Sequence, residues 1–278
     1  MSKISSTWKK MSFLIVAVLF AAPLPAEGLP DDMVQAWNQY VHLTEKRIER
    51  ELNSPIGFLS HDFQELAQAR ADRERILAGK LVVSKAKTTN IDGSEIKISG
   101  GMIHHWRGAV LIPGVSLDEV MNTVSHPDAK QHQQEDVLES KVLERTSDSA
   151  LVYMKLVRSK IVSVTYNTEH LVHYYRHGPR RASSRTTATK VAELADAGTL
   201  SEHEKAQGKD HGFLWRLNSY WRYEQVDEGV LVECESLTLS RSIPGIIAPI
   251  VRPIVNSVAK ESMRRTLSSI RGRFSNFS

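Results

Sequence analysis

The chain has 278 residues, of which 41% are hydrophobic, 36 are basic and 32 are acidic. This length is enough for one large domain or for one domain with an appendage, and a single cysteine excludes an intramolecular disulfide. The near balance of charge argues against a nucleic-acid-binding protein, which normally carries a clear basic excess.

The N-terminus has the order of a cleavable secretory signal peptide. Three lysines precede an apolar run at residues 13–22, and a short segment containing proline and alanine follows. The run is too short to span a bilayer, which takes ~20 residues. We therefore expect residues 1–26 to be removed and the mature chain, with a net charge of about +1, to work in the periplasm or outside the cell.

Residues 27–80 predict a helical appendage. Apolar residues recur at helical spacing from Asp31 to Leu52, and two acidic residues begin this helix, where the helix dipole favours them. A second helix is expected from about His61 to Leu77. Each helix has an apolar stripe that must be covered, most simply by the domain that follows.

From residue 81 onward the pattern changes to the alternation typical of β-strands. The first two strands are expected at 81–89 and 95–112, joined through an Asp-Gly step that suits a hairpin. Six more strands, separated by turn residues, are expected at 137–146, 149–158, 160–176, 180–194, 213–226 and 229–241.

Three other segments complete the predicted order. Ser116 and Glu119 form a capping box that opens a short helix. The polar segment 195–212 is interpreted as a surface insertion and a candidate mobile flap. A long amphipathic helix from about Pro249 to Arg273 ends the chain, and its length of roughly 37 Å is enough to cross a whole sheet.

The order of elements from Glu95 onward resembles the START-like helix-grip superfamily (SRPBCC), which includes lipid-transfer domains and polyketide cyclases. The stretches 211–222, 230–235 and 239–244 are similar to the closing strands of uncharacterised secreted bacterial members. The resemblance implies an α+β, START-like domain at 81–278, in which a curved antiparallel sheet of about seven strands wraps the long C-terminal helix. An apolar cavity is often left between sheet and helix in such a fold, which implies an apolar ligand.

Aromatic side chains share one face of the strand at 213–223. Its odd positions are mainly aromatic and its even positions mainly polar, so alternation should turn the odd face toward the long helix. The aromatics are either the wall of a ligand cavity or a bulky core that fills the space. The candidate ligand-binding residues are Trp106, Trp215, Trp221, Tyr223, Arg241, Ile254 and Val258.

No metal or cofactor is expected from the sequence. His104 and His105 are neighbours in a strand and point to opposite faces, as do His170 and His173, and no His-Glu-x-x-His motif occurs. Cys234 lies between two glutamates, which would raise a thiol pKa, so we expect a packed and unreactive cysteine.

Two groups of charged residues are interpreted as structural rather than functional. Cross-strand ion pairs on the solvent face account for Arg216, Arg222, Glu233 and Glu235. A solvated hairpin end, with contact to anionic lipid headgroups as the alternative, accounts for a basic strip of Arg176, Arg180, Arg181, Arg185 and Lys190.

The sequence therefore favours an exported carrier or sensor of an apolar small molecule, such as a lipid or a polyketide. One alternative is an enzyme of the cyclase or hydrolase type that uses the same cavity, which would need at least two ionisable groups within hydrogen-bond reach of each other. The other is an envelope interaction protein with a filled core, in which residues 27–80 or 195–212 bind a partner.

Overall fold

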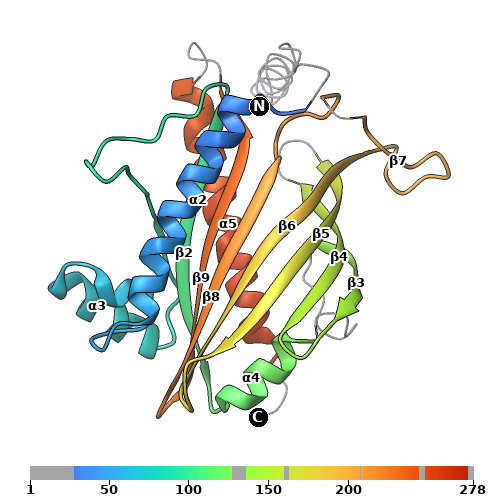
Figure 1. Ribbon diagram of the computed structural model, residues 1–278. Helices are drawn as coiled ribbons and strands as arrows, with labels where there is room; N and C mark the ends of the chain where they lie inside the picture. The colour runs from blue at the N-terminus through green and yellow to red at the C-terminus, as the bar shows by residue number, and fades with distance from the viewer. Residues whose placement is uncertain (1–27, 127–135, 160–162, 207, 244–247, 275–278) are drawn as a thin grey trace, which may run out of the picture.

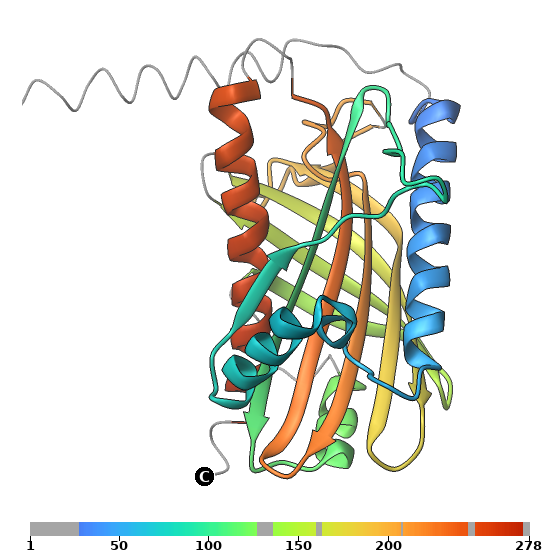
Figure 2. The ribbon, with the colours of Figure 1, turned by 90° about the vertical axis from the view of Figure 1, so that its left-hand side faces the viewer.

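An antiparallel sheet with helices on both faces forms the protein (Figures 1 and 2). The computed structural model describes residues 28–126, 136–159, 163–206, 208–243 and 248–274, except the side chains of 159 and 248–254. Within these residues, eight strands follow one another in the sheet in the order β1-β2-β9-β8-β6-β5-β4-β3, and a ninth, β7, pairs with β6 alone. The expected signal peptide lies outside the described residues, and the domain boundary at residue 80 stays a prediction.

The strands agree closely with the expected ranges in the second half of the chain. Their bounds are β1 (Val82–Lys85), β2 (Gly101–Pro113), β3 (Val137–Arg145), β4 (Ser149–Ser159), β5 (Ser163–Arg176), β6 (Arg181–Ala195), β7 (His203–Glu204), β8 (Arg216–Val226) and β9 (Gly229–Arg241). The helices are α2 (Asp31–Leu52), the 3-10 turn η1 (Ser60–Phe63), α3 (Leu66–Leu77), α4 (Leu117–Val124) and α5 (Ala248–Gly272).

Three predicted elements near the N-terminus are shorter than expected, and the first of them is the strand expected at 81–89, which covers only Val82–Lys85. The second helix is divided into η1 and α3, because Glu65 is not helical and its carboxylate caps the first amides of α3. The strand predicted from residue 95 begins only at Gly101, because Gly100 has φ +67°, which breaks an extended chain. Residues 86–100 form a loop that is closed by one bridge between Thr89 and Glu95.

Helix α5 covers one face of the sheet, which we call the inner face, and α2 covers the opposite, outer face (Figure 2). Met263, Leu267 and Ile270 of α5 lie at helical spacing and pack with Val110 and Val232 in the largest core cluster. The capped helix α4 closes the same core at its lower end in Figure 1. This arrangement confirms the predicted α+β fold, with a curved antiparallel sheet around a C-terminal helix.

The N-terminal helices also lie where their apolar stripes required. Met33, Trp37 and Tyr40 of α2 are buried in a second cluster with Leu237 and Leu239 of the sheet. Helix α3 packs at the edge formed by β1 and β2. Both faces of strand β9 are therefore covered, by α5 on one side and by the N-terminal layer on the other.

The insertion between β6 and β8 is tied to the sheet rather than detached from it. Strand β7 within it pairs with β6, and ion pairs join the insertion to β4 and β6: Lys155–Glu202 (2.7 Å), Lys190–Glu204 (2.9 Å) and Lys205–Glu193 (2.5 Å). Within the described part of the chain, no helix is both long and apolar enough to cross a membrane.

Candidate ligand-binding site on the inner face

Three of the predicted site residues lie on the inner face. Tyr223 is a buried member of the cluster that contains the α5 side chains, and Trp106 and Trp221 pack against this cluster. The rings of Trp221 and Tyr223 stack with their centroids 6.4 Å apart and 7° between their planes. The alternation of β8 therefore turns its odd positions toward α5, as the sequence predicted.

Trp215 departs from that alternation. It precedes β8, belongs to the cluster formed with α2, and donates its indole N–H to Asp210 at 3.0 Å. Arg241 ends β9 and is half-buried beside Gly212, whose φ of +76° and lack of a side chain leave room for both Arg241 and Trp215. Trp215 is thus not part of the inner aromatic wall, because strand parity holds only inside the strand.

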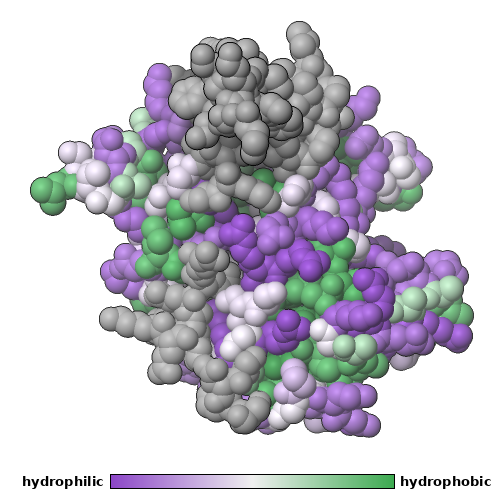
Figure 3. All heavy atoms as spheres, turned by 180° about the vertical axis from the view of Figure 1, so that it is seen from behind, coloured by the Kyte–Doolittle hydropathy of each residue, from purple (hydrophilic) through white to green (hydrophobic). Residues whose placement is uncertain are grey.

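Of the two predicted site residues on α5, the structure describes the side chain of only one. Val258 is half-buried on α5. The side chain of Ile254 lies outside the described residues. Seen from the α5 side, hydrophobic side chains gather in patches on this face among hydrophilic ones (Figure 3).

A second apolar surface covers the inner face of β3, β4 and β5, and sequence analysis did not single it out. Register pairs Ala150 with Val172 and Val152 with His170, so these residues share one face. Three residues form its buried core, and three others pack partly buried against them: Ala150, Val152 and Val172, with Val142, Met154 and Tyr174. We call these six residues the inner strip. No described residue of α5 belongs to this cluster.

Buried polar groups lie along the inner strip. The hydroxyl of Thr168 donates to the backbone oxygen of Met154 at 2.9 Å, so its lone pair accepts from Nε2–H of His170 at 2.8 Å. Burial lowers the pKa of His170 to about 4, so the ring is neutral at pH 7. The strip therefore combines apolar area with uncharged hydrogen-bonding groups.

Three polar atoms on the inner face are buried without a hydrogen-bond partner among the described residues: Ser140 Oγ, Tyr166 Oη and Trp106 Nε1. Tyr166 is 2% exposed and Ser140 is 9% exposed. Leaving a buried polar group unpaired costs about 1–3 kcal/mol. A ligand with polar atoms at these positions would supply the missing partners.

The charged residues of β8 and β9 are buried, which corrects the expectation that they face solvent. Arg222 is 1% exposed, Glu233 is 0% exposed and Glu235 is 1% exposed, whereas Arg216 is exposed as predicted. The cause is the N-terminal layer, since α2 and η1 cover this part of the outer face. Both faces of β9 carry apolar residues, with leucines at 231, 237 and 239 on one face and valines at 230 and 232 on the other, and this is the signal that could have indicated a strand covered on both sides.

Ionic contacts fasten the N-terminal layer to the sheet. Arg222 binds Glu51 of α2 at 2.5 Å and the backbone oxygen of Phe58 at 2.8 Å. Glu233 accepts the amides of Ser60 and His61 and also contacts the His61 ring. These contacts join segments that lie more than 150 residues apart in the chain.

Glu235 lies in a second buried group with His105. Tyr40 accepts the amide N–H of Thr88 and contacts Nδ1 of His105 at 2.9 Å, and Nε2 of the same ring contacts Glu235 at 2.5 Å. Burial opposes ionisation of Glu235, but His105 and then Arg47 outweigh it and hold the pKa of Glu235 at about 2. The carboxylate is therefore charged at pH 7.

The structure also shows the surroundings of the cysteine and histidines that the sequence analysis considered. Cys234 is buried, and burial, with the two flanking glutamates, raises its thiol pKa well above the usual value. His104 contacts Ser240 on the inner face, whereas His105 contacts Glu235 on the outer face. No group of three potential metal-ligating side chains occurs within the described residues.

Every member of the predicted basic strip forms an ion pair. The pairs are Arg176–Asp118, Arg180–Asp227, Arg181–Glu224, Arg185–Glu45 and Lys190–Glu204. Each positive charge of the strip therefore has an acidic neighbour, as the solvated hairpin end predicts, and contact with anionic lipid headgroups stays a prediction.

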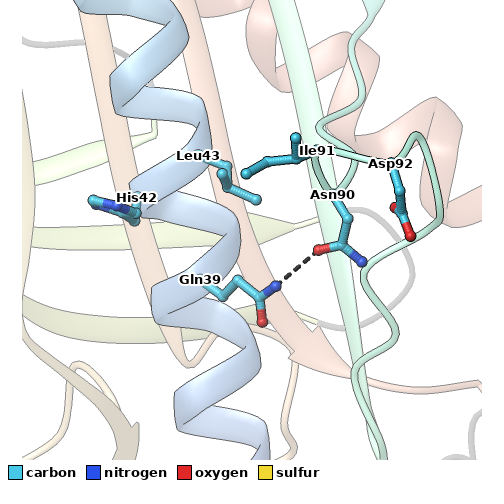
Figure 4. Close-up of a pocket in the computed structure, with 6 residues that line it drawn as sticks. All are labelled: Gln39, His42, Leu43, Asn90, Ile91 and Asp92. Carbon is cyan, nitrogen blue, oxygen red and sulfur yellow. Dashed lines mark hydrogen bonds between the residues drawn. The ribbon is translucent and has the colours of Figure 1, made fainter.

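Two surface pockets lie on the outer side of the molecule. The larger, about 450 Å³, lies between α2 and the turn at 90–92, where Gln39 donates to Asn90 at 2.7 Å (Figure 4). The smaller, about 260 Å³, lies near Arg73, Arg181 and Glu224. Neither pocket lies between α5 and the sheet, where the sequence placed the cavity.

Comparison with known proteins gives only structural likenesses. No protein-family model and no curated protein sequence matches the chain. The structure is similar to the STAR-related lipid transfer protein from Xanthomonas axonopodis, at 19% identity and a TM-score of 0.45, covering 69% of this chain and 98% of that one. It is also similar to the Zhui aromatase/cyclase from a Streptomyces species, at 11% identity and a TM-score of 0.40, covering 62% and 94%.

A third similar structure is a START superfamily protein from Mycobacterium smegmatis, at 10% identity and a TM-score of 0.37, covering 64% of this chain and 99% of that one. These proteins belong to the superfamily that the sequence resembles. The order of strands and the packing of the sheet around the C-terminal helix are observed in the structure itself. The chain itself has a helix-grip arrangement, in which an antiparallel sheet packs around the C-terminal helix, extended by an N-terminal helical layer on the outer face.

Proposed function

We propose that the protein is an exported carrier or sensor that binds an apolar small molecule, such as a lipid or a polyketide, on the inner face of its sheet. The observation that carries the proposal is the inner strip. It is an apolar surface separate from the α5 core, and buried polar groups without partners adjoin it. Ligand sites typically combine apolar walls with a few polar groups that fix orientation.

The aromatic residues Trp106, Trp221 and Tyr223 lie in or against the α5 cluster on the same inner face and would form the wall nearest to α5. Flat rings offer a large contact area at low conformational cost, which suits an apolar ligand. Burial raises the pKa of Tyr174, the ionisable member of the strip, and His170 beside the strip is neutral and bonded to Thr168. The strip therefore supports binding more directly than acid-base catalysis.

Export is proposed from the sequence, because the lysine-rich start and the short apolar run are typical of a signal peptide. Expression of the full chain in a Gram-negative host, followed by fractionation and mass measurement, tests it. We expect a periplasmic product that lacks about the first 26 residues. A full-length protein confined to the cytoplasm would contradict export.

Ligand uptake is tested by native mass spectrometry of the mildly purified protein and by titration with fluorescent fatty acids. We expect bound lipid-sized mass, and energy transfer from tryptophan to the probe. Met154→Arg places a charge on the half-buried inner strip and should abolish uptake. Tyr153→Arg, on the opposite face of the same strand, should preserve it. No uptake by the wild type, or uptake unchanged by Met154→Arg, would contradict the proposed site.

A further inference from the structure

Arg158 lies at one end of the inner strip. It is on β4, four residues beyond Met154, so strand alternation puts both side chains on the inner face. Arg158 and Ala150 are eight residues apart, which is about 26 Å along an extended strand. The strip is therefore long and apolar, with Arg158 at one end, while at the other end the exposed Arg145, the register partner of Ala150, donates to the backbone oxygen of Ser125.

Only one nitrogen of the Arg158 guanidinium contacts an acceptor among the described residues. Its Nη1 atom contacts Asp136 at 3.1 Å and the backbone oxygen of Val157 at 3.1 Å. Asp136 is shared with Arg265 of α5, at 3.2 Å, so this ion group bridges the sheet and the helix. Nε and Nη2 of Arg158 have no acceptor among the described residues, and the side chain is 37% exposed.

Tyr166 adjoins Arg158 on the same face. Register pairs Leu156 with Tyr166 and Arg158 with Val164, so Tyr166 is the diagonal neighbour of Arg158. Burial, with the nearby charge of Glu193, raises the pKa of Tyr166, so its hydroxyl stays protonated and can donate. That hydroxyl is one of the buried oxygens that have no hydrogen-bond partner among the described residues.

These groups form a set of donors without an acceptor. The nearest carboxylates are already engaged, since Asp136 binds two arginines and Glu193 binds Lys205 at 2.5 Å and the amide of His211 at 2.9 Å. A guanidinium presents its N–H groups in the geometry that carboxylate and phosphate oxygens accept. The missing acceptor is thus an anionic oxygen group.

We infer that the ligand is a long-chain amphiphile with an anionic headgroup, which Arg158 and Tyr166 bind while the chain lies along the inner strip. The inference rests on the proposed function and specifies its ligand class. A fatty acid and a lysophospholipid with a terminal phosphate share this chemistry, and they differ in headgroup charge and size.

The test compares acids with neutral analogues of the same chain. The protein is expressed from the full chain and purified as the cell processes it, and it is then titrated with parinaric acid and with its methyl ester. Lysophosphatidic acid and monoacylglycerol then compete for the site. We expect the wild type to prefer the acid by roughly tenfold to a hundredfold, the usual effect of a hydrogen bond to a charged group. The stronger competitor shows whether carboxylate or phosphate is favoured.

Three variants test the assignment. Arg158→Met should bring acid and ester to equal affinity, and Arg158→Lys should keep part of the preference, because it retains charge without the paired donors. Arg180→Met, at the exposed turn before β6, should keep the full preference. Tyr166→Phe should weaken binding of the acid but not of the ester. It provides the same test if an Arg158 variant does not fold. Equal binding of acid and ester to the wild type, or a preference that survives Arg158→Met, overturns the inference and leaves the proposed function standing. Failure of both to bind contradicts the proposed function itself.

Discussion

Replacing Arg222 by methionine tests whether buried charges hold the N-terminal layer on the sheet. The side chain is 2% exposed and contacts three acceptors: Glu51 at 2.5 Å, the Phe58 oxygen at 2.8 Å and Glu233 at 3.7 Å. Methionine fills a similar volume but leaves these oxygens without that partner. Removing one member of a buried ion pair costs about 3–5 kcal/mol, because the remaining charge stays buried.

The structure places the loss toward the lower end of that range. Glu51 keeps its contact with Arg47 at 2.9 Å, and Glu233 keeps the amides of Ser60 and His61. For a chain of this size, a loss of about 3 kcal/mol lowers Tm by roughly 6 to 12 °C. Urea unfolding at pH 7, followed by tryptophan fluorescence and by circular dichroism, measures the loss.

Arg216→Met is the matched control, because Arg216 has the same parity on β8 but is exposed. It should change the free energy of unfolding by less than about 0.5 kcal/mol. Adding Glu51→Gln to Arg222→Met should cost less than the sum of the single changes, since the two residues are in contact. Equal midpoints for Arg222→Met and Arg216→Met would refute the view that buried charge fastens the layer.

Three further predictions follow from the same structure. Glu235 has a depressed pKa of about 2, so the stability it contributes is present above its ordinary value of 4.5 and is lost as pH falls toward 2. Glu235→Gln should flatten this acid limb in a series of urea titrations, while Glu228→Gln, at an exposed position, should not; coincident curves for the two variants would contradict the assignment. Gly212→Ala should destabilise the protein more than Gly178→Ala, since both have positive φ but only at Gly212 would a Cβ lie 2.8 Å from an arginine side chain. Equal melting temperatures would count against this packing. Cys234 should react with a thiol reagent only after unfolding, because burial covers the thiol and raises its pKa; full labelling of the native protein at pH 7 would argue otherwise.

Local pattern was sufficient for the elements themselves. The apolar spacing from Asp31 to Leu52 gave the bounds of α2, and the Ser116 capping box marked the start of α4. Alternation along β8 also predicted correctly that Trp221 and Tyr223 face α5. Such features depend on neighbours within a few residues, so the sequence carries them directly.

Only part of the candidate site could be predicted from the sequence in this way. The aromatic wall is visible as a run on one strand, whereas the inner strip is assembled from three strands whose register the sequence does not state. Arg158 and Tyr166 each look unremarkable in their own strand. Their adjacency follows from the pairing of β4 with β5.

The sequence by itself determined most of the helices and strands and the sharing of faces within each strand. The tertiary structure alone decided what covers each face. Parity placed Arg222, Glu233 and Glu235 opposite the α5 core, but only the docking of α2 and η1 turned that face from solvent into a buried ionic layer. The physical reason is that side-chain alternation specifies a direction, while burial depends on a partner segment far away in the chain.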